Sequence, residues 1–131
     1  MSAVFDTEVL LAFYLGEPMG KKVEKYLEEV AKGAIKGYLS IVNLAELYYI
    51  LYRRSPALAD EKERNLRALG LEVVPVEDDE LWRMAATIKG RHGLSLADAF
   101  AAATAKAKKA KLLAGKDSEY GGIDVVLERL V

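Results

Sequence analysis

A chain of 131 residues, of which 52% are hydrophobic and 30% charged, is long enough to bury a core and too apolar to stay disordered. The absence of cysteine excludes disulfides and thiolate metal sites, and the single histidine, His92, excludes histidine-rich zinc sites. The net charge of −1 excludes a generally basic nucleic-acid coat, and no apolar run approaches the roughly 20 residues that span a bilayer.

Hydrophobic periodicity, together with start and stop signals, divides the chain into alternating strands and helices. In chain order we expect a strand at 3–5, helices at 7–16 and 18–32, a strand at 36–42, helices at 43–54 and 56–70, a strand at 71–76, helices at 78–91 and 96–109, and strands at 111–114 and 123–127. This alternation predicts an α/β fold with a mainly parallel sheet and helices on both faces. We find no linker and no signal peptide, so we expect one cytoplasmic domain over residues 1–131.

Three acidic residues stand in apolar surroundings, whereas most others lie in mixed-charge runs. Asp6 follows the first strand, Glu46 is the only charge in segment 37–52, and Asp98 is the only acid in segment 92–105. A lone carboxylate among apolar groups is unfavourable unless it is paired or binds a cation. Each of the three falls at the beginning of a predicted helix, which suggests a shared site.

Helix capping is the competing interpretation for two of these acids. Ser95 and Asp98 match a capping box, and Asn43 and Glu46 form a close variant with asparagine as the cap. An acid in the first helical turn also complements the helix dipole. For either acid alone both interpretations stay open.

A fourth acid, Asp117, comes three residues after the strand at 111–114. In an open parallel sheet, ligands bind outside the carboxyl ends of the strands. Several carboxylates that converge there would repel one another without a cation, and oxygen ligands suit Mg²⁺ or Mn²⁺. The sequence therefore predicts a divalent-metal site made of Asp6, Glu46, Asp98 and Asp117.

At these residues the chain resembles the PIN domains, and more narrowly the ribonuclease toxins of VapBC-type toxin–antitoxin pairs. The matching pieces lie at 4–7, 44–48, 96–99 and 111–120, and their order, their spacing and the total length all fit. The resemblance implies a three-layer α/β/α fold with a mostly parallel five-stranded sheet. It further implies endonuclease activity on RNA, one or two Mg²⁺ or Mn²⁺ ions, an antitoxin partner and a homodimer.

The resemblance also assigns residues. Asp6, Glu46 and Asp98 carry over as the core metal-binding and catalytic acids, and Asp117 carries over as the fourth. Family members often have Thr or Ser two residues before that fourth acid, where this chain has Gly115. Because of this departure, Glu119 is a second candidate for the fourth acid.

Residues outside the acidic set are candidates for contacts with RNA or protein. The basic candidates for RNA binding near the pocket are Arg53, Arg54, Lys106, Lys108, Lys109, Lys111 and Lys116. The competing interpretation of the lysines from 106 to 111 is a solvated helix C-terminus, where positive charge favours the helix dipole. Tyr48, Tyr49 and Tyr52 form either a dimer or antitoxin interface or ordinary core. We expect Trp82 in the core and His92 on the surface.

Two other functions are considered. A signalling receiver domain also gathers acids at strand ends, but it needs an acidic pair after the first strand and a Lys-Pro near the last, and neither occurs. A PIN-like module that binds RNA or protein without cutting remains the alternative. The retained acids argue against this module, and the glycine at position 115 keeps it open.

Overall fold

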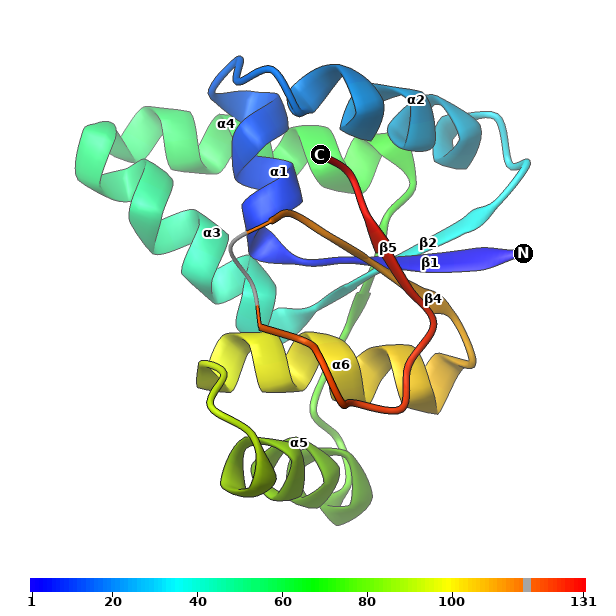
Figure 1. Cartoon of the computed structure of the whole chain (residues 1–131). Helices are drawn as coiled ribbons and strands as arrows, with labels where there is room; N and C mark the ends of the chain where they lie inside the picture. Colours follow the sequence, from blue (N-terminus) through cyan, green and yellow to red (C-terminus); the bar gives the residue numbers. More distant parts are fainter. Residues whose placement is uncertain (117–118) are drawn as a thin grey trace.

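The computed structural model describes residues 1–116 and 119–131 and shows a five-stranded sheet between layers of helices (Figure 1). The strand order is β3-β2-β1-β4-β5, and every strand pair is parallel. The strands are β1 (Ser2–Phe5), β2 (Lys36–Ser40), β3 (Glu72–Val74), β4 (Lys111–Ala114) and β5 (Leu127–Arg129). The helices are α1 (Thr7–Tyr14), α2 (Gly20–Ala31), α3 (Ile41–Arg54), α4 (Pro56–Leu69), α5 (Asp79–Arg91) and α6 (Leu96–Lys108). The predicted three-layer α/β/α architecture is confirmed.

The neighbouring inner strands β1 and β4 are apolar on both sides because helices cover both faces of the sheet. Ala3 and Phe5 pack with residues of α1 to α4 on one face, while Val4 packs with α5 and α6 on the other. In the same way, Leu113 faces the first layer and Leu112 the second. Strands buried on both faces appear in a sequence as continuous apolar runs, which is why both were predicted at nearly their observed bounds.

The boundary between β2 and α3 differs from the prediction. The strand expected over 36–42 ends at Ser40, and the helix expected to begin at Asn43 begins at Ile41. The Ser40 hydroxyl caps the helix by accepting a hydrogen bond from the Val42 backbone N–H at 3.2 Å. Ile41 and Val42 are β-branched and favour strands by themselves, and the cap overrides this local preference.

The last strand is also displaced from its predicted place at 123–127. Ile123 and Val125 pack, partly buried, against the layer of α5 and α6 without joining the ladder, which begins where Leu127 pairs with Leu112. The other predicted elements agree with the structure to within two residues at each end. None of the helices in the described part of the chain is long and apolar enough to cross a bilayer.

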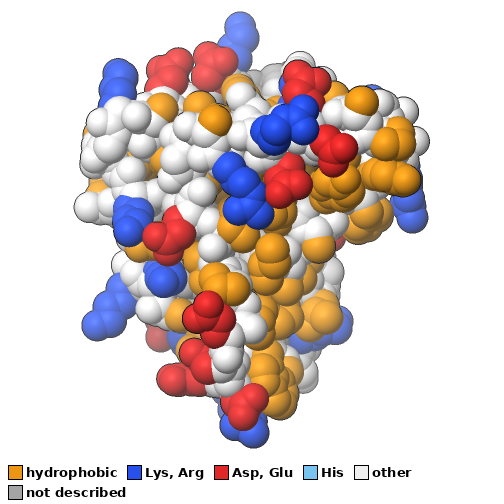
Figure 2. Space-filling model, turned by 180° about the vertical axis from the view of Figure 1, so that it is seen from behind, with side chains coloured by type: hydrophobic (Ala, Val, Ile, Leu, Met, Phe, Trp, Pro, Cys, Tyr) orange, Lys and Arg blue, Asp and Glu red, His pale blue; other side chains and the backbone are white. Residues whose placement is uncertain are grey.

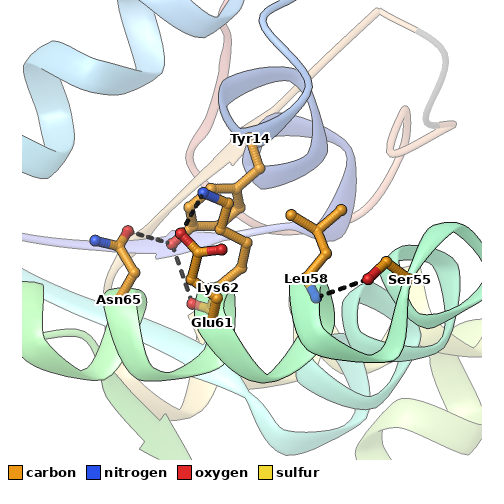
Figure 3. A network of polar contacts seen from close by, with 6 residues as sticks. All are labelled: Tyr14, Ser55, Leu58, Glu61, Lys62 and Asn65. Atoms are coloured by element: carbon orange, nitrogen blue, oxygen red, sulfur yellow. Dashed lines mark hydrogen bonds and ion pairs between the residues drawn. The ribbon is translucent and has the colours of Figure 1, made fainter.

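Polar contacts fix the end of α1 on α4 (Figure 3). The Tyr14 hydroxyl donates to Asn65 Oδ1 at 2.9 Å, and the Lys62 ammonium lies 5.5 Å from the centre of the Tyr14 ring. The helix α4 begins as predicted, with the Ser55 hydroxyl accepting from the Leu58 N–H at 3.3 Å. These contacts hold α1 in the first helical layer, so that its opposite end lies at the carboxyl edge of the sheet.

Candidate functional site

Asp6 stands at the junction of β1 and α1 and is completely buried. Its backbone N–H donates to the Leu113 carbonyl at 3.2 Å, which continues the pairing with β4. Its Oδ1 accepts from the Val9 N–H at 3.0 Å and so caps α1. The sheet and the helix thus fix this carboxylate from both sides, and its Oδ2 faces Tyr120.

Asp98 lies in the first turn of α6, half-buried beneath the same edge. Ser95 caps this helix as predicted, with its hydroxyl accepting from the Asp98 N–H at 3.1 Å. Burial raises the pKa of the Asp98 carboxyl above its usual range, against the opposing effect of hydrogen bonds with Tyr120 and Ser95. The capping role and the site role therefore coexist at this residue.

Tyr120 joins the two acids; it ends the fourth matching piece of the sequence, where no role was predicted for it. Its hydroxyl lies 3.2 Å from Asp98 Oδ1 and 3.4 Å from Asp6 Oδ2, and its side chain is only 1% exposed. Burial, and then the charges of Asp6 and Asp98, raise the pKa of Tyr120, so the phenol stays protonated. Because one hydroxyl proton can serve only one carboxylate at a time, the three groups form a tightly coupled cluster.

Glu46 lies half-buried on α3, in the second helical turn rather than the first. The capping-box interpretation of this acid is wrong, because Ser40 and not Asn43 caps the helix. Asn43 is instead completely buried in the first turn of α3. Within residues 1–116 and 119–131, no three acidic or histidine side chains stand close enough to hold a metal ion as placed.

The remaining acid positions follow β4. Asp117 lies outside the described residues, and Glu119 is exposed. A Cβ atom on Gly115 would lie 2.3 Å from Glu8 Cδ. The carboxylate of Glu8 thus occupies the space where a larger side chain at position 115 would start. Glu8 is a further acid at this edge that the sequence analysis missed.

The predicted basic residues are not all near the acids. Lys116 is exposed directly beside Gly115. Lys106, Lys108 and Lys109 lie at the far end of α6 from Asp98, on the order of 15 Å along the helix axis. The candidate role of this lysine run beside the acidic pocket is therefore wrong, because α6 leads away from the carboxyl edge, and the alternative of a lysine-rich helix C-terminus agrees with the structure.

Two of the predicted lysines, Lys108 and Lys111, have acidic partners away from the carboxyl edge of the sheet. The Lys108 ammonium lies 3.9 Å from a Glu72 carboxylate oxygen, and that of Lys111 lies 2.9 Å from Glu128. Arg53, in the last turn of α3, lies over the ring of Tyr49.

The aromatic residues divide between the two interpretations. Tyr48 is partly buried and donates to Asp60 Oδ1 at 2.6 Å. Tyr49 and Tyr52 are 46% and 51% exposed, so they are not core residues. Trp82, expected in the core, is 41% exposed on α5. Its position on the outer side of α5 leaves only a helical neighbour, Asp79, for its indole N–H. His92, expected on the surface, is partly exposed at the end of α5.

Comparison with known proteins identifies a family and a set of similar folds. The profile of the PIN domain family matches residues 3–125. VapBC2 from Rickettsia felis, solved bound to a promoter DNA fragment, is 18% identical with a TM-score of 0.79, and 98% of each chain is covered. A toxin–antitoxin complex from Klebsiella pneumoniae is 16% identical with a TM-score of 0.73, again over 98% of each chain.

A third similar structure is VapC20 from Mycobacterium tuberculosis, described as a toxin that cleaves the sarcin–ricin loop. It is 20% identical with a TM-score of 0.67, over 83% of this chain and 85% of that chain. No match is found among curated protein sequences. At these identities the similar structures establish a common fold.

Proposed function

The chain belongs to the PIN domain family, whose profile covers residues 3–125, and from this premise we propose that it is a Mg²⁺- or Mn²⁺-dependent endoribonuclease. The observation that carries the proposal is the meeting of Asp6 and Asp98 at the carboxyl edge of the sheet, where the Tyr120 hydroxyl contacts both. The similar fold of VapC20, a toxin that cleaves the sarcin–ricin loop, supports RNA as the substrate class.

The residues at this edge have the chemistry of a hard-cation site. Burial raises the pKa of Asp98, and no lysine or arginine of the described residues forms an ion pair with it, so a cation would favour its charged form. The available donors are oxygen atoms, which Mg²⁺ and Mn²⁺ prefer. We assign Asp6, Glu46 and Asp98 as metal ligands, with Asp117 as the fourth.

The reaction is hydrolysis of an RNA phosphodiester bond. Asp6, Glu46, Asp98 and Asp117 would hold the divalent ion, which when bound would lower the pKa of a water and offset charge that develops on the phosphate. Asp98 or Asp117 orients the attacking water, and the Tyr120 hydroxyl keeps Asp6 and Asp98 at their spacing. Lys116, exposed beside this edge, binds a phosphate oxygen of the RNA backbone.

We also assign the chain the role of toxin in a toxin–antitoxin pair, with an antitoxin protein as partner. Its fold is similar to those of VapBC2 and of the Klebsiella complex.

Hydrophobic side chains form a band on the face seen in Figure 2, and the exposed Tyr49 and Tyr52 on α3 are of the kind favoured at interfaces. We assign these tyrosines to a homodimer contact, which sedimentation velocity of the purified protein tests directly.

A PIN-like module that binds without cutting is the second candidate. It is favoured by Gly115, which brings no hydroxyl to the fourth motif, and by the spacing of the acids in the described part of the chain. Metal binding separates the two functions, because an ion that binds the folded state raises its thermal stability. A protein that neither cuts RNA nor gains stability with Mn²⁺ is the binding module.

The deciding experiment is cleavage of a mixed pool of structured RNAs, with Mn²⁺ or with EDTA, by the protein and two variants. Asp98→Asn should lose about 100-fold or more in rate, since it removes a charged ligand without changing side-chain size. Asp124→Asn is the matched control. Asp124 is an exposed residue of the segment before β5, and it lies 4.0 Å from Lys106, at the end of α6 that is far from Asp98. Equal cleavage by a folded Asp98→Asn variant would remove Asp98 from the site.

A further inference from the structure

Asn43 makes contact with both helices that begin beside the proposed ligands. Its side-chain amide donates to Thr7 Oγ1 at 3.1 Å and to the Ala97 carbonyl at 3.2 Å. The Thr7 hydroxyl in turn lies 3.4 Å from the Asn43 carbonyl, to which it donates. Thr7 directly follows Asp6, and Ala97 directly precedes Asp98. One buried side chain thus connects the starts of α1 and α6 to that of α3, all at one end of the sheet (Figure 1).

We propose that Asn43 is a positioning residue, whose amide holds Asp6, Glu46 and Asp98 in register for the divalent ion. The inference rests on the proposed function, since it concerns the same site. Glu46 follows Asn43 by three residues on α3, so the two side chains share a face of that helix. The three helices that carry the proposed core ligands therefore meet at this amide.

The orientation of the amide is fixed by its partners. The Ala97 carbonyl can only accept a hydrogen bond, so the NH₂ group of Asn43 must face it. The amide oxygen Oδ1 then points the other way, and within the described residues it is buried without a hydrogen-bond partner. A flipped amide would set two acceptors against each other and is excluded.

The unpaired oxygen indicates that asparagine is not the most stabilising residue for position 43. A buried acceptor without a partner is unfavourable, whereas an apolar side chain of similar size would leave no such group. The Ala97 carbonyl and the Thr7 hydroxyl keep other partners within and next to their helices. Asn43→Leu should therefore keep the fold while it releases the link between α1 and α6, which separates positioning from folding.

The test compares Asn43→Leu with Thr104→Val. Thr104 is also completely buried, but its hydroxyl donates to the Phe100 carbonyl of its own helix at 2.7 Å and reaches no second element. Calorimetric titration with Mn²⁺ should show a dissociation constant raised about tenfold or more in Asn43→Leu and unchanged in Thr104→Val. Thermal unfolding of both variants reports whether either change merely weakens the fold.

Hydrogen exchange supplies a readout that needs no metal. The N–H groups of Val9 and Asp98 are bound to the caps of α1 and α6. Both should exchange several-fold faster in Asn43→Leu, and at the wild-type rate in Thr104→Val. If Asn43→Leu does not fold, Thr7→Val takes its place, because it removes the hydroxyl of α1 that the Asn43 amide binds. This variant should likewise speed up exchange of the two N–H groups.

The outcomes separate the two proposals. If the wild-type protein binds no Mn²⁺ but Asn43→Leu shows faster exchange at both caps, the metal-dependent function fails and the link between the helices stands without its ligand role. If Asn43→Leu and Thr104→Val behave alike in titration and exchange, the positioning role of Asn43 is overturned.

Discussion

At the scale of single residues, the acidic edge is held together by a hydroxyl group. Tyr120 places its phenol between the buried Asp6 and the half-buried Asp98, and the low local polarity makes each contact stronger than it would be in water. Without that donor, the two carboxylates would face each other across a poorly hydrated gap. The site thus depends on a residue that is not itself an acid.

Replacement of Tyr120 by phenylalanine tests this dependence. In metal-free buffer, Tyr120→Phe should lower the free energy of unfolding by about 1–2 kcal/mol, because Asp6 and Asp98 lose the one buried donor that they share. Urea unfolding measures the change. Tyr38→Phe is the control, since Tyr38 is half-buried on β2 and its hydroxyl has no hydrogen-bond partner among the described residues, so this change should have no effect. Equal stability of the two variants would contradict the bridging role.

The position of the Glu8 carboxylate depends on the absence of a side chain at Gly115. A side chain at position 115 would start 2.3 Å from Glu8 Cδ, so Gly115→Ser should displace the Glu8 carboxylate and destabilise the fold by about 1 kcal/mol. In the Glu8→Ala background the same serine has room, and its cost should largely disappear. A double-mutant cycle of urea unfolding measures the coupling. Additive effects would show that the carboxylate does not fill this space.

The sequence predicted some of these residues and missed others for one physical reason. Asp6 and Asp98 stand out because charges are rare in apolar segments, which is a local signal. The roles of Tyr120 and Asn43 arise only from contacts with residues distant in the chain, as between Tyr120 and Asp6. Glu8 lies in an ordinary polar position of a first helical turn, and only the fold brings it against Gly115.

At the scale of elements, the accuracy of the prediction follows the strength of local signals. The helix α4 has Ser55 as its cap, proline at its first position and Gly70 in the left-handed conformation at its end, and its bounds were predicted to within one residue. The segment at 123–127 is apolar except for Asp124, as a buried strand often is, yet residues 123–126 pack outside the ladder and β5 begins at Leu127. Apolar character reports which side chains are buried, and pairing decides where an edge strand forms.

The crossing of α1 and α2 depends on the glycine that begins α2. A Cβ atom on Gly20 would lie 2.8 Å from the Ala12 carbonyl oxygen, and backbone cannot yield. Gly20→Ala should therefore destabilise the protein by about 1–3 kcal/mol despite alanine's better helix propensity. Gly90→Ala in α5 has open space and should stabilise by about 0.5 kcal/mol. Thermal unfolding compares the two, and a stabilised Gly20→Ala variant would show that the helices can separate.

At the scale of the whole molecule, the two edges of the sheet carry different chemistry. The carboxyl edge gathers Asp6 and Asp98 around a buried hydroxyl. The amino edge gathers lysines, such as Lys108 beside Glu72, that pair with acids of their own. Asp98 and Lys108 are close in sequence, but they lie at opposite ends of α6 and so at opposite edges of the sheet. Charge and sequence position alone therefore do not tell which lysines lie near the acids.

Besides its pairing with β4, the last strand is attached to the rest of the molecule through the side chain of Glu128. Lys111 of β4 donates to Glu128 Oε1 at 2.9 Å and to the Tyr26 hydroxyl at 2.9 Å, while that hydroxyl donates to Glu128 Oε2. The hydrogen bond from Tyr26, and then that from Lys111, lower the pKa of Glu128. One carboxylate thus connects β5, β4 and α2, so its titration should be felt in the global unfolding of the chain.

Because the pKa of Glu128 is lower in the folded state than in the unfolded state, its contribution to stability is present above the usual carboxyl range and is lost as the pH falls through the folded-state pKa. Its side chain is 41% exposed, so solvent screening keeps the contribution of Glu128 to about 0.5–1 kcal/mol. Glu128→Gln should therefore be less stable than the wild type by that amount at about pH 7, with the difference vanishing near pH 2. Urea unfolding at both pH values measures it, with Glu24→Gln on the exposed side of α2 as the control. A difference that persists at low pH would show that Glu128 acts through packing, and that β5 is held by its ladder rather than by this charge.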